Sequence, residues 1–254
     1  MTIIYLDSAG ISCPKGALVV GCSGSGKSAL LAAIARFLES QSRIRVILVD
    51  ALSLIQKEVG ESEKNIKRLF EGARSVAPCV VCLDNLDGVA PPRTAKGSES
   101  SRVADRTLST LLTEMDGVRE PWAPGEVVIL ASAPSTERLD PAVYRPGRLD
   151  LLIELPAPTP ETISRLVVDR LNPLLNEITD GGGEDVSKEC YSRVMHWIAN
   201  KRPSCCTYAD GVDLARSVIM SICVMKGEAS PLTVEMLLSA MDRITCGSAP
   251  NSSI

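Results

Sequence analysis

The stretch "GCSGSGKS", at Gly21–Ser28, decides the fold that this sequence predicts. It satisfies the pattern G-x-x-x-x-G-K-[ST], in which glycines let backbone N–H groups wrap an anion and a lysine neutralises its charge. The apolar run "ALVV" (17–20) precedes it and the helical pattern "KSALLAAIARFL" (27–38) follows it. Strand, loop and helix N-terminus stand in the order that a phosphate site needs, so we predict that this stretch holds a triphosphate. A glycine-rich turn without a ligand is the alternative.

Further apolar runs recur through the first half of the chain: "RVILVD" (45–50), "CVVCLD" (79–84), "EVVILA" (126–131) and "LLIEL" (151–155). Helical patterns separate them, which predicts a parallel sheet covered by helices on both faces. One of these helices carries an apolar stripe at Ile66, Leu69, Phe70 and Ala73. The expected N-cap of that helix is Ser62, because a serine side chain can accept a hydrogen bond from a backbone N–H of the first turn.

The alternation of strands and helices stops after "LPAPTPE" (155–161). The remaining sequence shows helical patterns and ends in the polar tail "GSAPNSSI" (247–254). We therefore predict an α/β core over residues 1–157 and a helical domain with a polar tail over residues 158–254.

Charge and cysteine usage limit the class of protein. The formal net charge of -4 argues against a dedicated nucleic-acid-binding protein, although weak or local RNA contact stays open. Nine scattered cysteines favour a reducing compartment. No signal peptide and no apolar run of about 20 residues is found, so we expect a soluble, cytoplasmic protein without a membrane span. Association with the nucleus or an organelle surface stays open.

The pair Cys79 and Cys82 has the spacing of a metal site, but it lies inside an apolar run and lacks a second cysteine pair. We interpret both cysteines as core residues.

Several segments together resemble the AAA-type ATPases of the AAA+ superfamily. Besides the phosphate loop, they are "VGESEKNIKRLFEGAR" (59–74), "DRTLSTLLTEMDGV" (105–118), "LDPAVYRPGRLD" (139–150) and "GVDLARSVI" (211–219). The resemblance extends over nearly the whole chain. It is nearest to the two-ring group that includes the valosin-containing-protein-like, peroxisomal-biogenesis and ribosome-maturation ATPases.

The resemblance implies a P-loop NTPase fold, a doubly wound α/β domain followed by a small helical lid. It further implies a homo- or hetero-hexameric ring of AAA subunits, with ATP and Mg²⁺ bound between neighbours. The substrate would be a protein or ribonucleoprotein complex, remodelled in a chaperone-like way, and direct nucleic-acid binding is not expected.

The resemblance also assigns residues to the nucleotide. Lys27 would neutralise the β- and γ-phosphates, and Ser28 and Asp84 would organise Mg²⁺. The residues matched to nucleotide binding are Gly21, Cys22, Ser23, Gly24, Ser25, Gly26, Lys27, Ser28 and Ala29 in the loop, and Gly211 and Val212 in the lid. Valine stands where the family's lid carries alanine, which leaves the contact of Val212 with the base open.

The segment "RPGR" matches the family's arginine fingers at Arg145 and Arg148. In such rings a subunit donates these arginines to the nucleotide of its neighbour. An arginine supplied in trans can raise the rate of phosphoryl transfer by roughly 10³–10⁵.

The chain departs from the family where water is activated. Asn85 follows Asp84, at the position where the family carries the glutamate that acts on the attacking water. An amide can orient water but is not a useful base at neutral pH. General-base catalysis is worth roughly 10²–10⁴-fold, so turnover is expected to fall by that order while binding survives. Asp87 is a candidate to compensate.

Other departures point the same way. The asparagine that senses the γ-phosphate would fall at Pro134, or at Ser132 or Ser135 if the alignment slips by a residue. Glu58 replaces the aromatic ring with which protein-threading members grip a polypeptide. Only about twenty residues precede the phosphate loop, where the family has a longer segment that encloses adenine. We expect weaker adenine binding from that, and a truncated, fragmentary or divergent module.

We rank three hypotheses. The first is an ATP-binding AAA subunit with weak or absent hydrolysis that donates arginine fingers to an active neighbour. The second is an active AAA ATPase that remodels protein or ribonucleoprotein complexes, with another residue positioning the water. The third is a structural module whose phosphate loop binds nothing.

Overall fold

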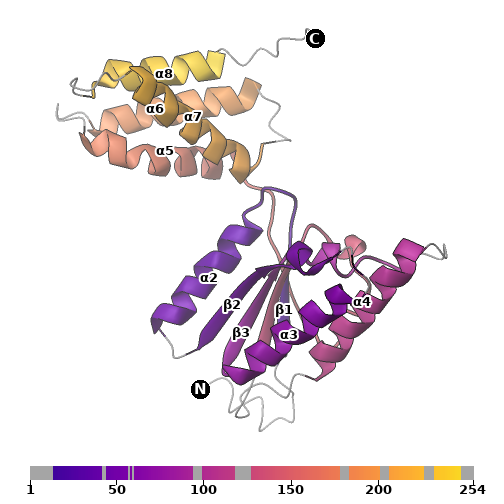
Figure 1. Ribbon diagram of the computed structural model, residues 1–254. Helices are drawn as coiled ribbons and strands as arrows, with labels where there is room; N and C mark the ends of the chain where they lie inside the picture. The colour runs from indigo at the N-terminus through magenta and orange to yellow at the C-terminus, as the bar shows by residue number, and fades with distance from the viewer. Residues whose placement is uncertain are drawn as a thin grey trace. The chain divides into compact units, whose positions relative to one another are not determined.

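The computed structural model describes residues 14–41, 44–56, 58, 60–93, 99–117, 127–177, 183–200, 206–225 and 232–246. The chain divides into two compact units, residues 1–156 and 157–254 (Figure 1). Each unit has its own hydrophobic core.

The first unit is an α/β domain built on a five-stranded, all-parallel sheet with the order β2-β3-β4-β1-β5. Its strands are β1 (Gly16–Val20), β2 (Arg45–Asp50), β3 (Cys79–Asp84), β4 (Val127–Ala133) and β5 (Leu151–Glu154). Its helices are α2 (Lys27–Gln41), α3 (Glu61–Ser75) and α4 (Glu99–Asp116), with short 3-10 turns η1 (Ala51–Leu54), η2 (Leu86–Gly88) and η3 (Thr136–Arg138). The predicted α/β class and P-loop NTPase fold are confirmed.

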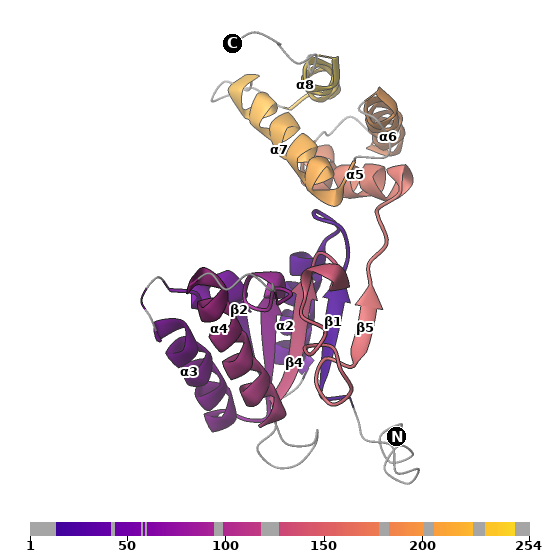
Figure 2. The same cartoon turned by 90° about the vertical axis from the view of Figure 1, so that its right-hand side faces the viewer.

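Helix α2 covers one face of the sheet, and α3 and α4 cover the other (Figures 1 and 2). Leu31 of α2 packs against Val19 and Cys82, while Ile66 of α3 packs on the opposite face with Leu18. The prediction of cover on both faces therefore holds for the inner strands. It fails at β5, where every residue is exposed, because β5 is an edge strand paired only with β1.

Helix α3 confirms the predicted apolar stripe but not its predicted cap. Ile66 and Phe70 are fully buried, and Leu69 packs against the same cluster. The N-cap is Gly60, in the left-handed region with φ 85°, and Ser62 lies inside the first turn. Ser62 Oγ instead accepts the backbone N–H of Gln56 at 2.8 Å, so it ties the preceding segment to the helix.

Cys79 and Cys82 are core residues, as predicted. They lie three positions apart on β3, so their side chains point to opposite faces of the sheet and pack in different clusters. Burial raises the pKa of both thiols, that of Cys82 to about 11. Within the residues that the structure describes, no group of three or more His, Cys, Asp or Glu side chains is arranged to hold a metal ion.

The second unit is helical and contains α5 (Pro160–Glu177), α6 (Gly183–Asn200), α7 (Tyr208–Met225) and α8 (Val234–Cys246). Aliphatic side chains and Trp197 form its core. Gly211 of α7 is buried, and a Cβ there would lie 2.9 Å from Cγ2 of Ile163, so glycine permits α5 and α7 to approach closely. Among the described helices of both units, none is long and apolar enough to cross a membrane.

Candidate functional site

The candidate site lies where the parallel strands of the first unit end. Because every strand runs in the same direction, the carboxyl ends meet at one edge of the sheet, which is where ligands bind in open α/β folds. The phosphate loop leaves β1 there, and Asp50 and Asp84, register partners in the β2–β3 ladder, are the last residues of their strands. Ser132 of β4 lies between β1 and β3 in the strand order.

The phosphate loop has the backbone shape that its glycines predict. Gly24 and Gly26 have φ values of 75° and 92°, which side-chain-bearing residues rarely adopt. A Cβ at Gly21 would lie 2.8 Å from the backbone oxygen of Leu155 and 2.8 Å from Ser25 Oγ. The loop is therefore a close-packed backbone turn that a side chain at position 21 would distort.

The polar groups of this loop fit a phosphate. Lys27, at the start of α2, is nearly buried, and its Nζ donates to the carbonyl oxygens of Gly21 at 2.8 Å and Cys22 at 2.9 Å. Its ammonium is thus held under the loop. Ser25 Oγ is buried and makes no hydrogen bond within the described part of the chain. A buried, unpaired hydroxyl beside a held cation is the arrangement expected of a cradle built for an anion.

Ser132 joins the ends of β3 and β4. Its side chain is fully buried, and its hydroxyl donates a short hydrogen bond to Asp84 Oδ1. The same oxygen accepts the backbone N–H of Asn85 at 3.2 Å. Ser132 therefore fixes the carboxylate that the resemblance assigns to Mg²⁺. Pro134 and Ser135 follow the strand and are half-buried.

Asn85 is held in an unusual backbone conformation. Its φ and ψ of 56° and 48° lie in the left-handed region, which asparagine tolerates better than other residues with a side chain. Its Nδ2 donates to Asp50 Oδ1 at 3.3 Å, and the same oxygen accepts the backbone N–H of Leu52 at 3.1 Å. Asp87 is half-buried in the turn that follows.

Sequence reasoning did not identify Asp50 as part of this site. The available signal was that "RVILVD" and "CVVCLD" are both apolar runs ended by aspartate. Such runs become neighbours only when the strand order is known.

The two predicted arginine fingers have different surroundings. Arg148 makes a two-pronged ion pair with Asp116, Nε to Oδ1 at 2.7 Å and Nη2 to Oδ2 at 2.8 Å, and its Nη1 donates to the carbonyl oxygen of Ala142 at 2.5 Å. This hydrogen bonding lowers the pKa of Asp116 and raises that of Arg148. Arg145 is exposed, and its side chain has no hydrogen bond or ion pair with the described residues.

The remaining predicted residues lie elsewhere. Glu58 is exposed before α3, while its neighbours at positions 57 and 59 fall outside the described residues. Gly211 and Val212 belong to the second unit, where Gly211 contacts α5 and Val212 is partly exposed. Their approach to a nucleotide stays a prediction.

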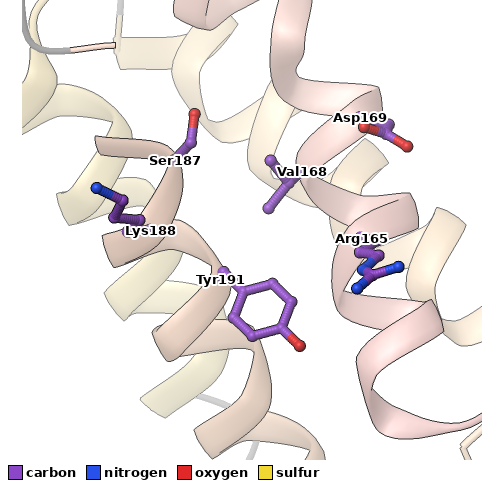
Figure 3. A pocket seen from close by; sticks show the side chains of 6 residues that line it. All are labelled: Arg165, Val168, Asp169, Ser187, Lys188 and Tyr191. Atoms are coloured by element: carbon purple, nitrogen blue, oxygen red, sulfur yellow. The ribbon is translucent and has the colours of Figure 1, made fainter. Parts of the chain in front are cut away.

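The second unit has a hollow of its own, between α5 and α6, with a volume of about 300 Å³. Figure 3 shows the side chains around it, Arg165, Val168 and Asp169 from α5 and Ser187, Lys188 and Tyr191 from α6. None of these side chains belongs to the phosphate loop or to the ends of the strands, so we assign the hollow no part in nucleotide binding.

Comparison with known proteins supports the same identification. The family described as "ATPase family associated with various cellular activities (AAA)" matches residues 17–157. The Cell division cycle protein 48 homolog of Archaeoglobus fulgidus is 41% identical over 151 residues, 59% of this chain and 19% of that protein. The Ribosome biogenesis ATPase RIX7 of Saccharomyces cerevisiae is 40% identical over 152 residues, 59% of this chain and 17% of that protein.

A third relative is the Proteasome-activating nucleotidase of Methanococcus vannielii, 37% identical over 169 residues, 65% of this chain and 40% of that protein. In each of these alignments the chain spans less than half the length of the relative. The phosphate loop on β1, the acid that ends β3 and the family match over most of the first unit lead to one conclusion: the chain belongs to the AAA ATPase family.

Proposed function

We propose that this chain is an ATP-binding AAA subunit with weak or absent hydrolysis of its own, which donates an arginine to a neighbouring subunit of a ring. The observation that carries the proposal is the contrast within one site. Lys27, Ser25 and Asp84 are arranged for a triphosphate and its metal ion, while the adjacent position for a carboxylate base holds the amide of Asn85.

The binding half of the proposal rests on the loop and the end of β3. The loop backbone and the Lys27 ammonium would hold the phosphates, and the Ser28 hydroxyl and the Asp84 carboxylate would hold Mg²⁺. Bound Mg²⁺ would neutralise charge on the phosphates. Ser132 keeps the Asp84 carboxylate in place for that role.

The weak hydrolysis follows from the chemistry of the amide. A base must accept the proton of the attacking water, and the Asn85 side chain does not do so at neutral pH. With its Nδ2 donating to Asp50, its Oδ1 is free to accept a hydrogen bond from water and orient it. We expect turnover lower by roughly 10²–10⁴-fold than in a site with a carboxylate base.

The donated arginine is proposed to be Arg145. It is exposed in the turn after η3, whereas Arg148 is bound to Asp116 and Ala142 of its own chain. Arg148 then acts as a positioning residue that holds the turn bearing Arg145. Assembly into a homo- or hetero-hexameric ring, and remodelling of protein or ribonucleoprotein substrates in the cytoplasm, belong to the proposal on the strength of the resemblance.

The test measures binding and turnover in the same samples. A fluorescent ATP analogue titrated into the full chain should bind, and Lys27→Ala should weaken binding by about 10–100-fold, as expected for the loss of charge-assisted hydrogen bonds. Lys67→Ala, on the exposed side of α3, is the control and should bind normally. Absence of binding by both the unchanged chain and Lys27→Ala would favour the third hypothesis, a loop without a ligand.

The second candidate is an active ATPase in which a carboxylate other than residue 85 acts on water. The observation that favours it is the presence of acids beside Asn85, with Asp50 in contact and Asp87 in the next turn. Rapid hydrolysis by the unchanged chain, lost in Asp87→Asn or Asp50→Asn and insensitive to Asn85→Ala, would establish it.

A further inference from the structure

The ends of β2 and β3 present an acid and an amide to each other. Asp50 and Asp84 are register partners, and Asn85 is the next residue after Asp84. The Asn85 amide reaches across to Asp50, Nδ2 to Oδ1 at 3.3 Å. Asp50 is thus the side chain that contacts the residue at the water-activating position.

We propose that Asp50 is a positioning residue of this site, and that the pair of side chains at positions 50 and 85, rather than Asn85 alone, sets the rate of hydrolysis. The inference rests on the proposed function, since it takes Asn85 to lie at the water-activating position. Its consequence is specific: a glutamate at position 85 works as a base only if the acid at position 50 is replaced by an amide.

The first step of the argument concerns the orientation of the amide. An ionised carboxylate only accepts hydrogen bonds, so the atom that Asn85 turns to Asp50 must be its NH₂ group. Its Oδ1 consequently faces away from Asp50. Asp50 thereby fixes which end of the amide is left to meet water.

The second step concerns what holds Asp50. Its Oδ1 also accepts the backbone N–H of Leu52 at 3.1 Å and caps the η1 turn. The carboxylate therefore cannot turn away from position 85 without uncapping that turn. An asparagine at position 50 keeps this arrangement, because its oxygen can cap the turn while its NH₂ group donates towards position 85.

The third step concerns a carboxylate at position 85. In Asn85→Glu, two acids would meet where an acid and an amide now share a hydrogen bond. Carboxylates at such a distance cannot both be ionised without strong repulsion, so one takes up a proton or moves away. Either outcome removes a correctly placed base. In Asn85→Glu/Asp50→Asn the hydrogen bond returns with its direction reversed, from the amide at 50 to the acid at 85.

A working carboxylate at position 85 would take a proton from water. The water oxygen forms a bond to the γ-phosphorus as the bond from that phosphorus to the β–γ bridging oxygen breaks. ADP leaves with the electron pair of the broken bond, and the proton passes on to solvent.

The experiment compares five forms of the full chain at saturating ATP and Mg²⁺: unchanged, Asn85→Glu, Asp50→Asn, Asn85→Glu/Asp50→Asn, and Asn85→Glu/Glu71→Gln. The last removes one negative charge from an exposed position on α3 and is the matched control. Nucleotide affinity is measured with a fluorescent ATP analogue, and phosphate release is measured separately, so that binding and turnover are separated. Thermal unfolding of each form checks that it is folded.

We expect nucleotide affinities within about threefold of one another. Asn85→Glu and its Glu71→Gln control should stay within about tenfold of the unchanged chain in turnover, while the Asp50→Asn double variant gains roughly 10²–10⁴-fold. Equal gains by Asn85→Glu and the double variant would overturn the role of Asp50 and leave the proposed function intact. Failure of the folded, ATP-binding double variant to gain would overturn the inference as well.

Rapid turnover by the unchanged chain is a separate outcome, and it contradicts the proposed function. In that case Asp50→Asn decides the inference. A fall in turnover of at least tenfold without loss of nucleotide affinity would support a role for Asp50, and an unchanged rate would overturn it.

Discussion

Arg148 and Asp116 form a two-pronged ion pair, with nitrogen–oxygen distances of 2.7 Å and 2.8 Å. The third prong of the guanidinium binds the Ala142 carbonyl, so one side chain ties the turn after η3 to the end of α4. A residue predicted from its motif to reach a neighbouring subunit is thus engaged within its own chain. Arg145, two turn residues earlier, lacks such ties to the described residues.

The two arginines should therefore respond differently to substitution. Arg148→Ala should lower the free energy of unfolding by about 1–2 kcal/mol, through loss of the carbonyl bond and a partly buried ion pair. Arg145→Ala should change it by less than about 0.5 kcal/mol, as expected for an exposed side chain. Urea unfolding of both variants checks this, and equal stability losses would contradict the assignment.

Arg145→Ala should instead act in trans. With the AAA subunit that co-purifies with the chain, the variant should lower that partner's ATP hydrolysis by roughly 10³–10⁵ if the arginine is donated across the interface. The assay is phosphate release by the mixed assembly. A normal partner rate with a fully assembled Arg145→Ala ring would rule out the donation.

The same ion pair predicts a dependence of stability on acid. Arg148 holds the pKa of Asp116 below the model value of 3.8. A carboxyl whose pKa is depressed by folding stabilises the protein above its unfolded pKa, and that contribution is lost as the pH falls through the folded value. Since Asp116 is more than half exposed, we expect an effect below about 1 kcal/mol. Urea midpoints should fall less between pH 6 and pH 3, as approximate test limits, in Asp116→Asn than in the unchanged chain; parallel curves would contradict this.

A methyl group added to the phosphate loop should be costly. In Gly21→Ala the new Cβ would meet a backbone oxygen at 2.8 Å, which cannot move as a side chain can. We expect a stability loss of about 1–3 kcal/mol together with weaker ATP binding. The matched control is Gly72→Ala in α3, where a Cβ meets nothing within 4 Å and helix propensity should stabilise by about 0.5–1 kcal/mol. Similar losses in both variants would argue against the close-packed loop.

Cysteine labelling reports directly on the loop. Cys22 is exposed within the phosphate loop, so a maleimide should modify it, and saturating ATP should slow that reaction. Cys223 on α7 is exposed but lies in the helical unit, and its labelling should not respond. Cys82, buried and with its thiol pKa raised to about 11, should react only on unfolding. Labelling of Cys22 that ignores ATP would speak against a nucleotide in the loop.

Much of the first unit could be predicted because its signals are local. The glycine loop between an apolar run and a helical pattern determines β1 and α2, and the apolar stripe of α3 follows from residue spacing. The position of Asn85 after Asp84 was legible for the same reason. Ser62 was misplaced because the left-handed Gly60 serves as the N-cap instead.

The contacts that define the site could not be predicted, because they depend on strand order and register. Ser132 reaches Asp84 only since β4 lies beside β3, and Asp50 reaches Asn85 only since β2 and β3 pair in that register. The engagement of Arg148 by Asp116 likewise joins segments 32 residues apart. Spacing along the chain does not encode such pairs.

The most direct test of the account is steady-state ATP hydrolysis by the purified, unchanged chain, with the bound fraction of nucleotide measured in the same sample. Enzymes typically turn over about 10 times per second, and loss of the base lowers that by roughly 10²–10⁴. The account predicts a chain saturated with ATP that releases phosphate at about 0.1 per second or less. Turnover of about 1 per second or faster, unchanged in Asn85→Ala, would contradict it.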